Sequence, residues 1–199
     1  MSTFWVVTTL CIIFSLVSIG GLYIYWVVLN RRFSTVKKYR VYRSGALRPA
    51  LLEKKVRKLG IRTVIDLRRD KENGRIRKEK DFLEHLGVQH IHLRSRQVPR
   101  ATTVKSFLKI MNKQENYPVL IHCSHGRGRA CLFSAIYLME YLDRSRILTC
   151  VSLFWNPLLG SFNPLSSKGQ FILSYAPVLS SKKIAGPFVK MAEKYSVTS

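Results

Sequence analysis

The feature that most constrains this chain is a long apolar run close to its N-terminus. The run Phe4–Leu29 (FWVVTTLCIIFSLVSIGGLYIYWVVL) contains no charged residue. A helix rises about 1.5 Å per residue, so this run is long enough to cross a hydrocarbon layer of roughly 30 Å. The run predicts a transmembrane helix, and we expect residues 1–30 to form a membrane anchor.

Two other interpretations of the run are a secretory signal peptide and a buried core helix. A signal peptide has a basic beginning and a shorter apolar core that ends in small residues. Here the preceding residues, MST, carry no side-chain charge, and the apolar run is longer than such a core. The comparison favours a transmembrane helix.

A basic segment, residues 31–40, follows the apolar run directly, whereas no basic residue precedes the run. Positive residues favour the cytoplasmic side of a membrane. We therefore expect a single-pass membrane protein whose C-terminal domain faces the cytoplasm. The basic residues of this juxtamembrane segment are Arg31, Arg32, Lys37, Lys38 and Arg40.

The net charge of +23 resides entirely in residues 31–199, because the apolar run contributes none. Such a charge implies an anionic partner: nucleic acid, an anionic membrane face or a phosphorylated substrate. A basic domain tethered to a membrane faces acidic headgroups by geometry alone, so lipid proximity is the simplest explanation. No nucleic-acid-binding motif is recognisable, and we expect no nucleic-acid partner.

The cysteines predict neither a disulfide framework nor a zinc site, because they form no CxxC pair and have no regular spacing. His122 and His125 flank Cys123 closely, but no second group of ligands completes a metal site. We expect no bound metal. The four cysteines are Cys11, Cys123, Cys131 and Cys150.

The soluble part alternates between helical and strand patterns. Apolar spacing predicts helices at residues 50–60, 75–86, 102–111 and 130–142; the first ends in Gly60, and Gly87 follows the second. Short apolar runs predict strands at residues 61–67, 88–93 and 118–122. The alternation indicates an α/β domain with a central, mostly parallel sheet flanked by helices.

The segment LIHCSHGRGRACLF carries the densest chemistry of the chain. In a parallel sheet, function gathers at the carboxyl ends of strands, where a loop leads into the next helix. Gly126 and Gly128 let the loop fold tightly, so that successive amide groups form an anion nest reinforced by the helix dipole. The same field favours the thiolate of Cys123, and Arg129 can fold back to grip two phosphoryl oxygens.

HCSHGRGR resembles the signature loop of the cysteine-dependent phosphatases, the protein tyrosine and dual-specificity superfamily, whose pattern is His-Cys, five residues, Arg. The preceding strand PVLIH and the helix that follows make the resemblance specific. A second match lies at residues 42–68, YRSGALRPALLEKKVRKLGIRTVIDLR, which is similar to the first strand, helix and second strand of compact dual-specificity phosphatases. The resemblance covers residues 39–142.

The resemblance implies a mechanism and a set of site residues. Cys123 would attack phosphorus, Arg129 and the loop amides would stabilise the phosphoryl oxygens, and His122 would support the cysteine. No metal or cofactor is required. The residues expected to bind the substrate are Ser124, His125, Gly126, Arg127 and Gly128.

Two departures from the family pattern bear on catalysis. Family members usually have Ser or Thr after the arginine, where the hydroxyl stabilises the cysteine as a leaving group, but this chain has Ala130. The general acid is normally an aspartate before the cysteine, and the corresponding residues 90–101 (HIHLRSRQVPRA) contain no carboxylate. The candidates that remain open as substitutes are His90, His92, Asp66 and Asp70.

The division of the chain follows from these patterns. Residues 41–143 are expected to form the phosphatase-like domain. Residues 144–199 form a basic C-terminal extension with little periodicity. The extension could pack behind the loop, touch the membrane surface or be disordered, and the sequence leaves this open.

The sequence leaves two substrate classes and two activities open. Arg127 makes the loop similar to the C-x-x-G-K-G-R loop of phosphoinositide phosphatases, so the partner is either an anionic phospholipid or a phosphorylated protein. The first hypothesis is an active membrane-anchored phosphatase. The second is a pseudophosphatase that binds phosphorylated protein or lipid without turnover. A Walker-type nucleotide loop is excluded because no Gly-Lys-Ser/Thr ending is present.

Overall fold

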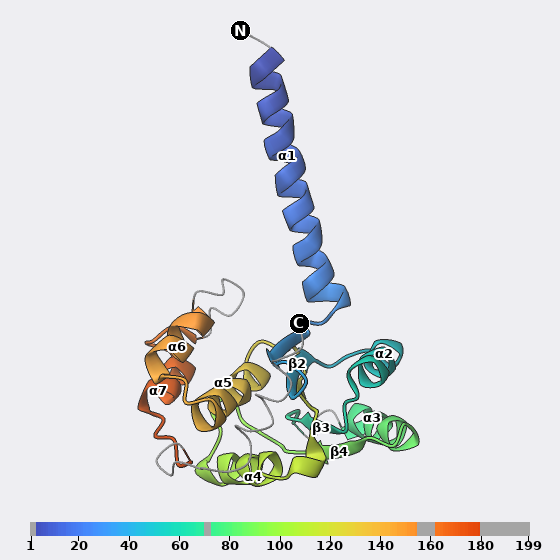
Figure 1. Ribbon diagram of the computed structural model, residues 1–199, viewed down its shortest axis with the longest axis vertical. Helices are drawn as coiled ribbons and strands as arrows, with labels where there is room; N and C mark the ends of the chain where they lie inside the picture. Colours follow the sequence, from blue (N-terminus) through green and yellow to red (C-terminus); the bar gives the residue numbers. More distant parts are fainter. Residues whose placement is uncertain (1–2, 70–72, 155–161, 180–199) are drawn as a thin grey trace, which may run out of the picture.

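A computed structural model of the protein describes residues 3–69, 73–154 and 162–179, and its centre is a five-stranded sheet (Figure 1). The strand order is β1-β2-β5-β3-β4, with β1 antiparallel to β2 and the other neighbours parallel. This arrangement confirms the predicted α/β fold with a mostly parallel sheet. The strands are β1 (Ser34–Lys37), β2 (Val41–Gly45), β3 (Thr63–Asp66), β4 (Gln89–His92) and β5 (Val119–Cys123).

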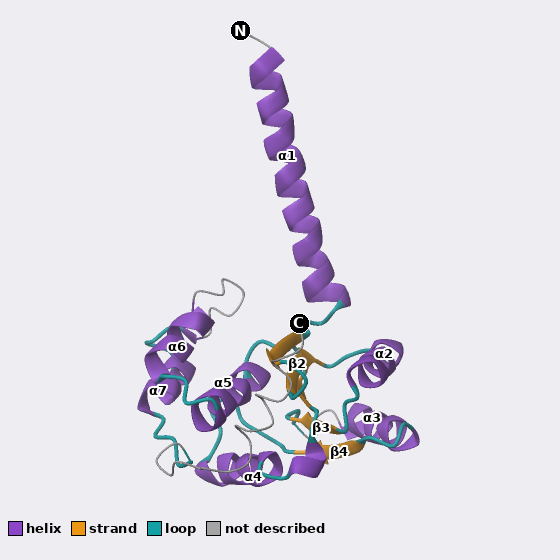
Figure 2. Cartoon of the chain, in the orientation of Figure 1, coloured by secondary structure: helices purple, strands orange, loops and turns teal. Residues whose placement is uncertain are grey.

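Helices cover both faces of the sheet (Figure 2). α2 and α3 lie on one face, whereas α4 and α5 lie on the other, and α6 and α7 pack against α5. A sheet covered on both faces is typical of parallel strands, whose residues are then apolar throughout. The helices of the body are α2 (Pro49–Leu59), α3 (Asn73–His85), α4 (Ala101–Met111), α5 (Arg129–Tyr141), α6 (Arg146–Phe154) and α7 (Ser167–Ser174).

The N-terminal apolar run forms one helix that projects away from the body (Figure 1). α1 (Thr3–Ile24) continues into a π-helical turn, Tyr25–Leu29. The span Phe4–Leu29 has a mean hydropathy of 2.2, and none of its most apolar stretch is buried against the body. By length and composition this helix can cross a membrane.

The pleat of β5 divides its side chains between two apolar clusters. Val119 and Ile121 pack into the cluster formed with α4 and α5, whereas Leu120 packs into the cluster formed with α2 and α3. Successive side chains of a strand point to opposite faces. The next two residues, His122 and Cys123, therefore point to different faces of the sheet.

Local signals placed most elements within a few residues of their observed bounds. α2 begins with Pro49 in its first turn, and Gly60 ends it with a φ of 61° and an N–H bond to the carbonyl of Val56. The predicted strands correspond to β3, β4 and β5. The sequence analysis missed β1, because its four residues, STVK, lie in a polar basic segment.

The described part of the C-terminal extension packs on the domain. α6 and α7 lie against α5, and Cys150, Phe162 and Ile172 are buried in the same cluster as the core of that helix. Of the three possibilities left open for the extension, packing behind the loop is the one observed for these residues. Residues 155–161 and 180–199 of the extension lie outside the described residues.

Candidate active site

The candidate nucleophile lies at the end of the central strand. β5 ends at Cys123 and α5 begins at Arg129, so residues 124–128 form the connecting loop, which we call the phosphate loop. Cys123 is 3% exposed, and its Sγ accepts the N–H of Gly126 at 3.3 Å. The amide of Gly126 thus points to the sulfur at the N-terminal end of a helix, where backbone donors favour an anion.

Gly126 is required by a close approach between backbones. Its φ is 71°, and a Cβ built there would lie 2.6 Å from the backbone nitrogen of Gly45 and 2.9 Å from the carbonyl carbon of Ser44. No side chain fits that space, and the left-handed φ itself favours glycine. The phosphate loop therefore rests directly on the end of β2.

Arg129 is folded back over the phosphate loop. The side chain is 8% exposed, Nη1 donates to the carbonyl of Leu67 at 2.5 Å, and Nη2 donates to Oγ of Ser124 at 3.2 Å. These two bonds fix the plane of the guanidinium above the loop. A guanidinium in that position can bind two oxygens of one phosphoryl group.

A buried charge network supports the residue before the cysteine. Nε2 of His122 lies 2.8 Å from a carboxylate oxygen of Glu79 on α3. Arg68 joins Glu79 to Asp66 at the end of β3, with Nη2 at 2.9 Å from the first and 2.8 Å from the second. The network lies on the α3 side of the sheet, so it holds His122 from the face opposite Cys123.

The network lowers the pKa of both carboxyl groups. Burial by itself would raise the pKa of Asp66, but bonding to His90 and the charges of His122 and Arg68 hold it well below its usual range. For Glu79, burial also raises the pKa, and His122 and Arg68 lower it by more. Both groups are therefore carboxylates at neutral pH.

The same cluster has the composition of a metal site. One ligand atom from each of Asp66, Glu79, His90 and His122 can be chosen so that all four lie within 4.8 Å of one another. However, Arg68 already donates to both carboxylates. The guanidinium supplies the positive charge that a metal would bring, so the cluster fits an ion network better than a metal centre.

Of the four candidate general acids, the three that the structure describes are engaged with partners other than the thiol. Asp66 is fully buried and bound to Arg68, and His90 contacts Asp66 in the same network. Nε2 of His92 lies 3.0 Å from the carbonyl of Arg68. Asp70 lies outside the described residues.

Two residues that the sequence analysis missed lie beside the phosphate loop. A Cβ built on Gly128 would lie 2.8 Å from Oε1 of Gln97 and 3.0 Å from Nζ of Lys168. Gln97 comes from the segment before α4, and Lys168 comes from α7. Neither could be found from local pattern, because the fold alone brings these segments to the loop.

Lys168 is a partly buried cation among other cations. Burial lowers its pKa, negative charge on the sulfurs of Cys131 and Cys123 raises it, and the charges of Arg127 and Arg129 lower it further. Within the described part of the chain its ammonium group has no carboxylate in salt-bridge distance. The group lies 5.6 Å from the centre of the Phe162 ring, in a cation–π contact. The mouth of the loop therefore holds unpaired positive charge.

The juxtamembrane segment touches the phosphate loop. Nη1 of Arg32 donates to the carbonyl of His125 at 3.0 Å, and the N–H of Gly45 donates to the carbonyl of Arg31 at 2.7 Å. Burial and the neighbouring Arg127 lower the pKa of Arg32. The loop thus lies at the end of the body from which α1 departs.

Comparison with known proteins gives one family match. Residues 26–151, more than half of the chain, match the family model described as "DSP-PTPase phosphatase fused to NAD+ Kinase". The matched residues contain the phosphate loop and β1 to β5. Among curated proteins none matches the chain.

Solved phosphatases share the fold. The core catalytic domain of the PP-IP phosphatase Siw14 of S. cerevisiae, solved with citrate, has 19% identity and a TM-score of 0.58, covering 82% of this chain and 92% of that chain. TpbA of P. aeruginosa, solved as a variant with phosphotyrosine, has 18% identity and a TM-score of 0.58, covering 78% of this chain and 90% of that chain. At these identities the likeness concerns the fold.

The buried network predicts a pH dependence of stability. Because the pKa values of Asp66 and Glu79 are lower in the folded than in the unfolded chain, their stabilisation is complete at neutral pH. It is lost as pH falls below the unfolded carboxyl value of about 4. We expect Asp66→Asn to lower the free energy of unfolding by about 3 kcal/mol at pH 7 and to flatten its decline with acid.

Denaturant unfolding of the full chain in micelles, followed by circular dichroism from neutral to acidic pH, measures this effect. Glu53→Gln is the matched control, because Glu53 forms a solvent-exposed pair with Arg57. An Asp66→Asn protein with the native slope against pH would contradict the assignment.

Proposed function

This chain belongs to the DSP-PTPase phosphatase family, and on that premise we propose that it is a membrane-anchored enzyme that hydrolyses phosphate monoesters through a phosphocysteine at Cys123. One observation carries the proposal: the sulfur of Cys123 accepts a loop amide while the guanidinium of Arg129 is fixed over the same loop. A thiol among backbone donors, a helix N-terminus and a guanidinium is arranged as a nucleophile toward a phosphate ester.

The chemistry takes two steps. In the first, the thiolate of Cys123 attacks phosphorus, an S–P bond forms, the P–O bond to the alcohol breaks, and the leaving oxygen takes a proton from solvent. In the second, water attacks phosphorus and gives up a proton to solvent, the S–P bond breaks, and inorganic phosphate leaves with the thiolate restored. Arg129 stabilises the equatorial oxygens in both steps, and His122 acts as a positioning residue for the cysteine.

The remaining loop residues hold the phosphoryl group. The N–H of Gly126 points to the sulfur of Cys123, the other loop amides are proposed to bind phosphoryl oxygens, and the side chain of Arg127 adds a charge for a substrate with more than one anionic group. The residues proposed to bind the substrate are Ser124, His125, Gly126, Arg127 and Gly128.

We propose that the chain is organised around the membrane. Residues 1–30 form the anchor, residues 31–40 the basic juxtamembrane segment, residues 41–143 the phosphatase-like domain, and residues 144–199 an extension. An apolar span followed by basic residues supports a single pass with the domain in the cytoplasm.

The substrate class proposed first is an anionic phospholipid headgroup. The contact between Arg32 and the carbonyl of His125 supports this class, because it ties the phosphate loop to the segment that follows the apolar span. The large positive charge of the body supports the same class. Siw14 is a PP-IP phosphatase and TpbA binds phosphotyrosine, so a phosphorylated protein is the other class to test.

A pseudophosphatase is the second candidate, and a specific observation favours it. Ala130 is fully buried and offers no hydroxyl to the cysteine, and no carboxylate lies in residues 90–101. Binding through the loop would survive both changes, whereas turnover would be slowed by each of them. Such a protein would hold phosphorylated protein or lipid without releasing phosphate.

Burst kinetics separate the two candidates. With full chain in micelles and p-nitrophenyl phosphate, a phosphotyrosine peptide or short-chain phospholipids as substrates, we expect phosphate release that Cys123→Ser lowers at least about 1000-fold. Ala130→Ser restores a hydroxyl for the second step, so steady-state turnover should rise about tenfold or more while the burst stays unchanged. Release that is equal in Cys123→Ser would refute the enzyme, and binding with neither burst nor turnover would favour the pseudophosphatase.

Topology is tested with reporters on the full chain. Two reporter enzymes are fused in turn after Ser199, one that is active only in the cytoplasm and one that is active only outside it. Because the basic residues follow the apolar span, we expect activity only from the cytoplasmic reporter. As the matched variant, moving the charges of Arg31 and Arg32 to the N-terminal side of the span should reduce this bias. Activity only in a reporter that works outside the cytoplasm would reverse the proposed orientation.

Lys168 is proposed as a further substrate-binding cation. Its ammonium group lies beside Gly128 and has no carboxylate partner among the residues that the structure describes, so an anionic substrate should supply its counter-charge. We expect Lys168→Gln to raise KM about tenfold for a substrate with a second phosphate group, to raise it less for p-nitrophenyl phosphate, and to be rescued by Lys168→Arg. Lys54→Gln on the exposed face of α2 is the control, and equal changes for both substrates would refute this role.

A further inference from the structure

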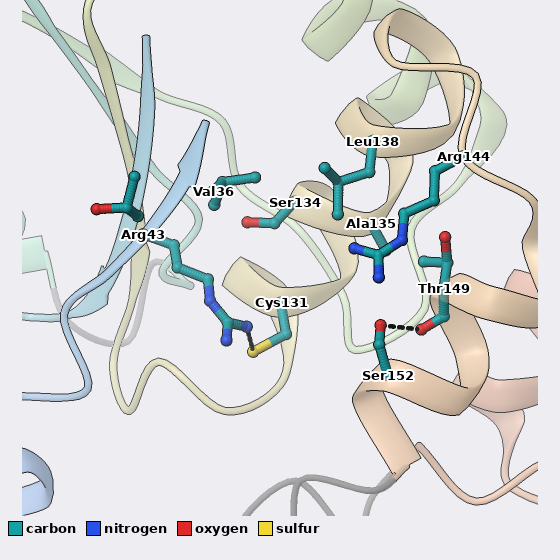
Figure 3. A pocket seen from close by; sticks show the side chains of 10 residues that line it. Val36, Arg43, Cys131, Ser134, Ala135, Leu138, Arg144, Thr149 and Ser152 are labelled. Carbon is teal, nitrogen blue, oxygen red and sulfur yellow. Dashed lines mark hydrogen bonds between the residues drawn. The ribbon is translucent and has the colours of Figure 1, made fainter. Parts of the chain in front are cut away.

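A second cavity lies behind α5, apart from the phosphate loop (Figure 3). It has a volume of about 180 Å³ and is enclosed by β1, β2, α5, α6 and the turn before α6. This volume holds a small group, since one water needs only about 10–15 Å³ of such space. Two guanidinium groups line it from opposite sides, Arg43 of β2 and Arg144 of the turn before α6.

The guanidinium of Arg43 has no counter-ion in the described part of the chain. Its hydrogen-bond partner is the sulfur of Cys131, toward which Nη1 points (Figure 3). Burial raises the pKa of Cys131 to about 11, although Arg43 lowers it, so this thiol is neutral at physiological pH. A neutral thiol is a weak acceptor, and a guanidinium has five donors to satisfy.

Arg144 on the other side is likewise without a carboxylate in salt-bridge distance among the described residues, and the residues that line the cavity include no Asp or Glu. Two cations that share a partly enclosed space repel each other unless an anion lies between them. The cavity therefore has the charge of an anion site.

A buried hydroxyl is the independent observation that points to a ligand. Thr149 is fully buried, it lines the cavity, and its Oγ1 has no hydrogen-bond partner within residues 3–69, 73–154 and 162–179. The two neighbouring serine hydroxyls already donate to backbone carbonyls. Ser134 donates to the carbonyl of Ala130 at 2.7 Å, and Ser152 donates to the backbone carbonyl of Thr149 at 2.9 Å. Buried polar groups are normally hydrogen-bonded, so the hydroxyl of Thr149 is available to donate a hydrogen bond to a ligand in the cavity.

We propose that this cavity is a second anion site that takes a phosphate group, with Arg43, Arg144 and Thr149 as its donors. The group comes either from a lipid headgroup or from free phosphate. Thr35 and Val36, which also line the cavity, belong to the first strand after the apolar span. The few residues between the span and that strand reach at most roughly 20 Å, so a headgroup is within range.

The second site shares a wall with the first. The thiol of Cys131 that Arg43 contacts also donates to the carbonyl of Gly126 in the phosphate loop, at 3.2 Å. The same glycine donates its N–H to Cys123. An anion bound to Arg43 is therefore linked to the proposed nucleophile through two intervening residues, Cys131 and Gly126.

Calorimetric titration of inorganic phosphate into the full chain in micelles tests the proposal. The native chain should bind two equivalents, one at the phosphate loop and one in the cavity. Thr149→Val is nearly isosteric and removes only the unpartnered hydroxyl, so its melting temperature without phosphate should be unchanged or higher. Thr149→Val should nevertheless lower the affinity for phosphate at one of the two sites about tenfold, and so should Arg144→Gln. The control, Arg77→Gln on the exposed face of α3, should change the affinity of neither site.

Arg129→Met distinguishes failure of this proposal from failure of the proposed function. If it removes the single equivalent that the native chain binds, the cavity takes no phosphate, and the proposal is wrong while the loop assignment stands. If one equivalent remains that Thr149→Val and Arg144→Gln weaken, the cavity site stands whatever the loop does. Phosphate binding that neither cavity variant changes would overturn the proposal.

A second titration, with a lipid in place of inorganic phosphate, identifies the source of the phosphate group. Short-chain phosphatidic acid that binds at least about tenfold more tightly than inorganic phosphate, with the gain lost in Arg144→Gln, would assign the site to a headgroup. Equal affinities would assign it to free phosphate. Both results support the site, and binding of neither compound would refute it.

Discussion

The backbone of the phosphate loop lies so close to the end of β2 that no side chain fits between them. A Cβ on Gly126 would collide with the backbone of Gly45, and a Cβ on Gly45 would lie 3.1 Å from the carbonyl carbon of His125. The N–H of Gly45 is bound to the carbonyl of Arg31. One close contact therefore joins the loop, the parallel sheet and the segment that follows the apolar span, and the position of the thiol depends on it.

The pleat of β5 keeps two kinds of charge apart. His122 points toward the buried carboxylates on the α3 side, while Cys123 points toward α5 and the cations at the mouth of the loop. If a carboxylate lay on the thiol side, it would pair with Arg129 and compete with a phosphate for it. Because neighbouring residues of a strand face opposite ways, acidic groups can position the cysteine without entering the anion site.

The elements that depend on local sequence pattern were predicted from the sequence, whereas contacts between residues far apart in the chain were missed. The helix that ends at Gly60 and the strand–loop–helix around Cys123 are encoded by residues a few positions apart. The approach of Gln97 and Lys168 to Gly128 is not, because only the folded chain brings α7 and the segment before α4 to one loop. The pairing of Glu79 with His122 was missed for the same reason, since α3 must first pack on the sheet.

The packing of the extension explains how a lysine so far along the chain reaches the loop. The carboxylate of Glu140 on α5 accepts the hydroxyl of Tyr175 at 2.5 Å and the N–H groups of Val178 and Leu179 at 3.0 and 2.8 Å. A buried carboxylate that lost these donors would be costly, so the bonds fix the chain after α7 against α5. α5 also carries Arg129 in its first turn, so one helix sets the positions of both Arg129 and Lys168 relative to the loop.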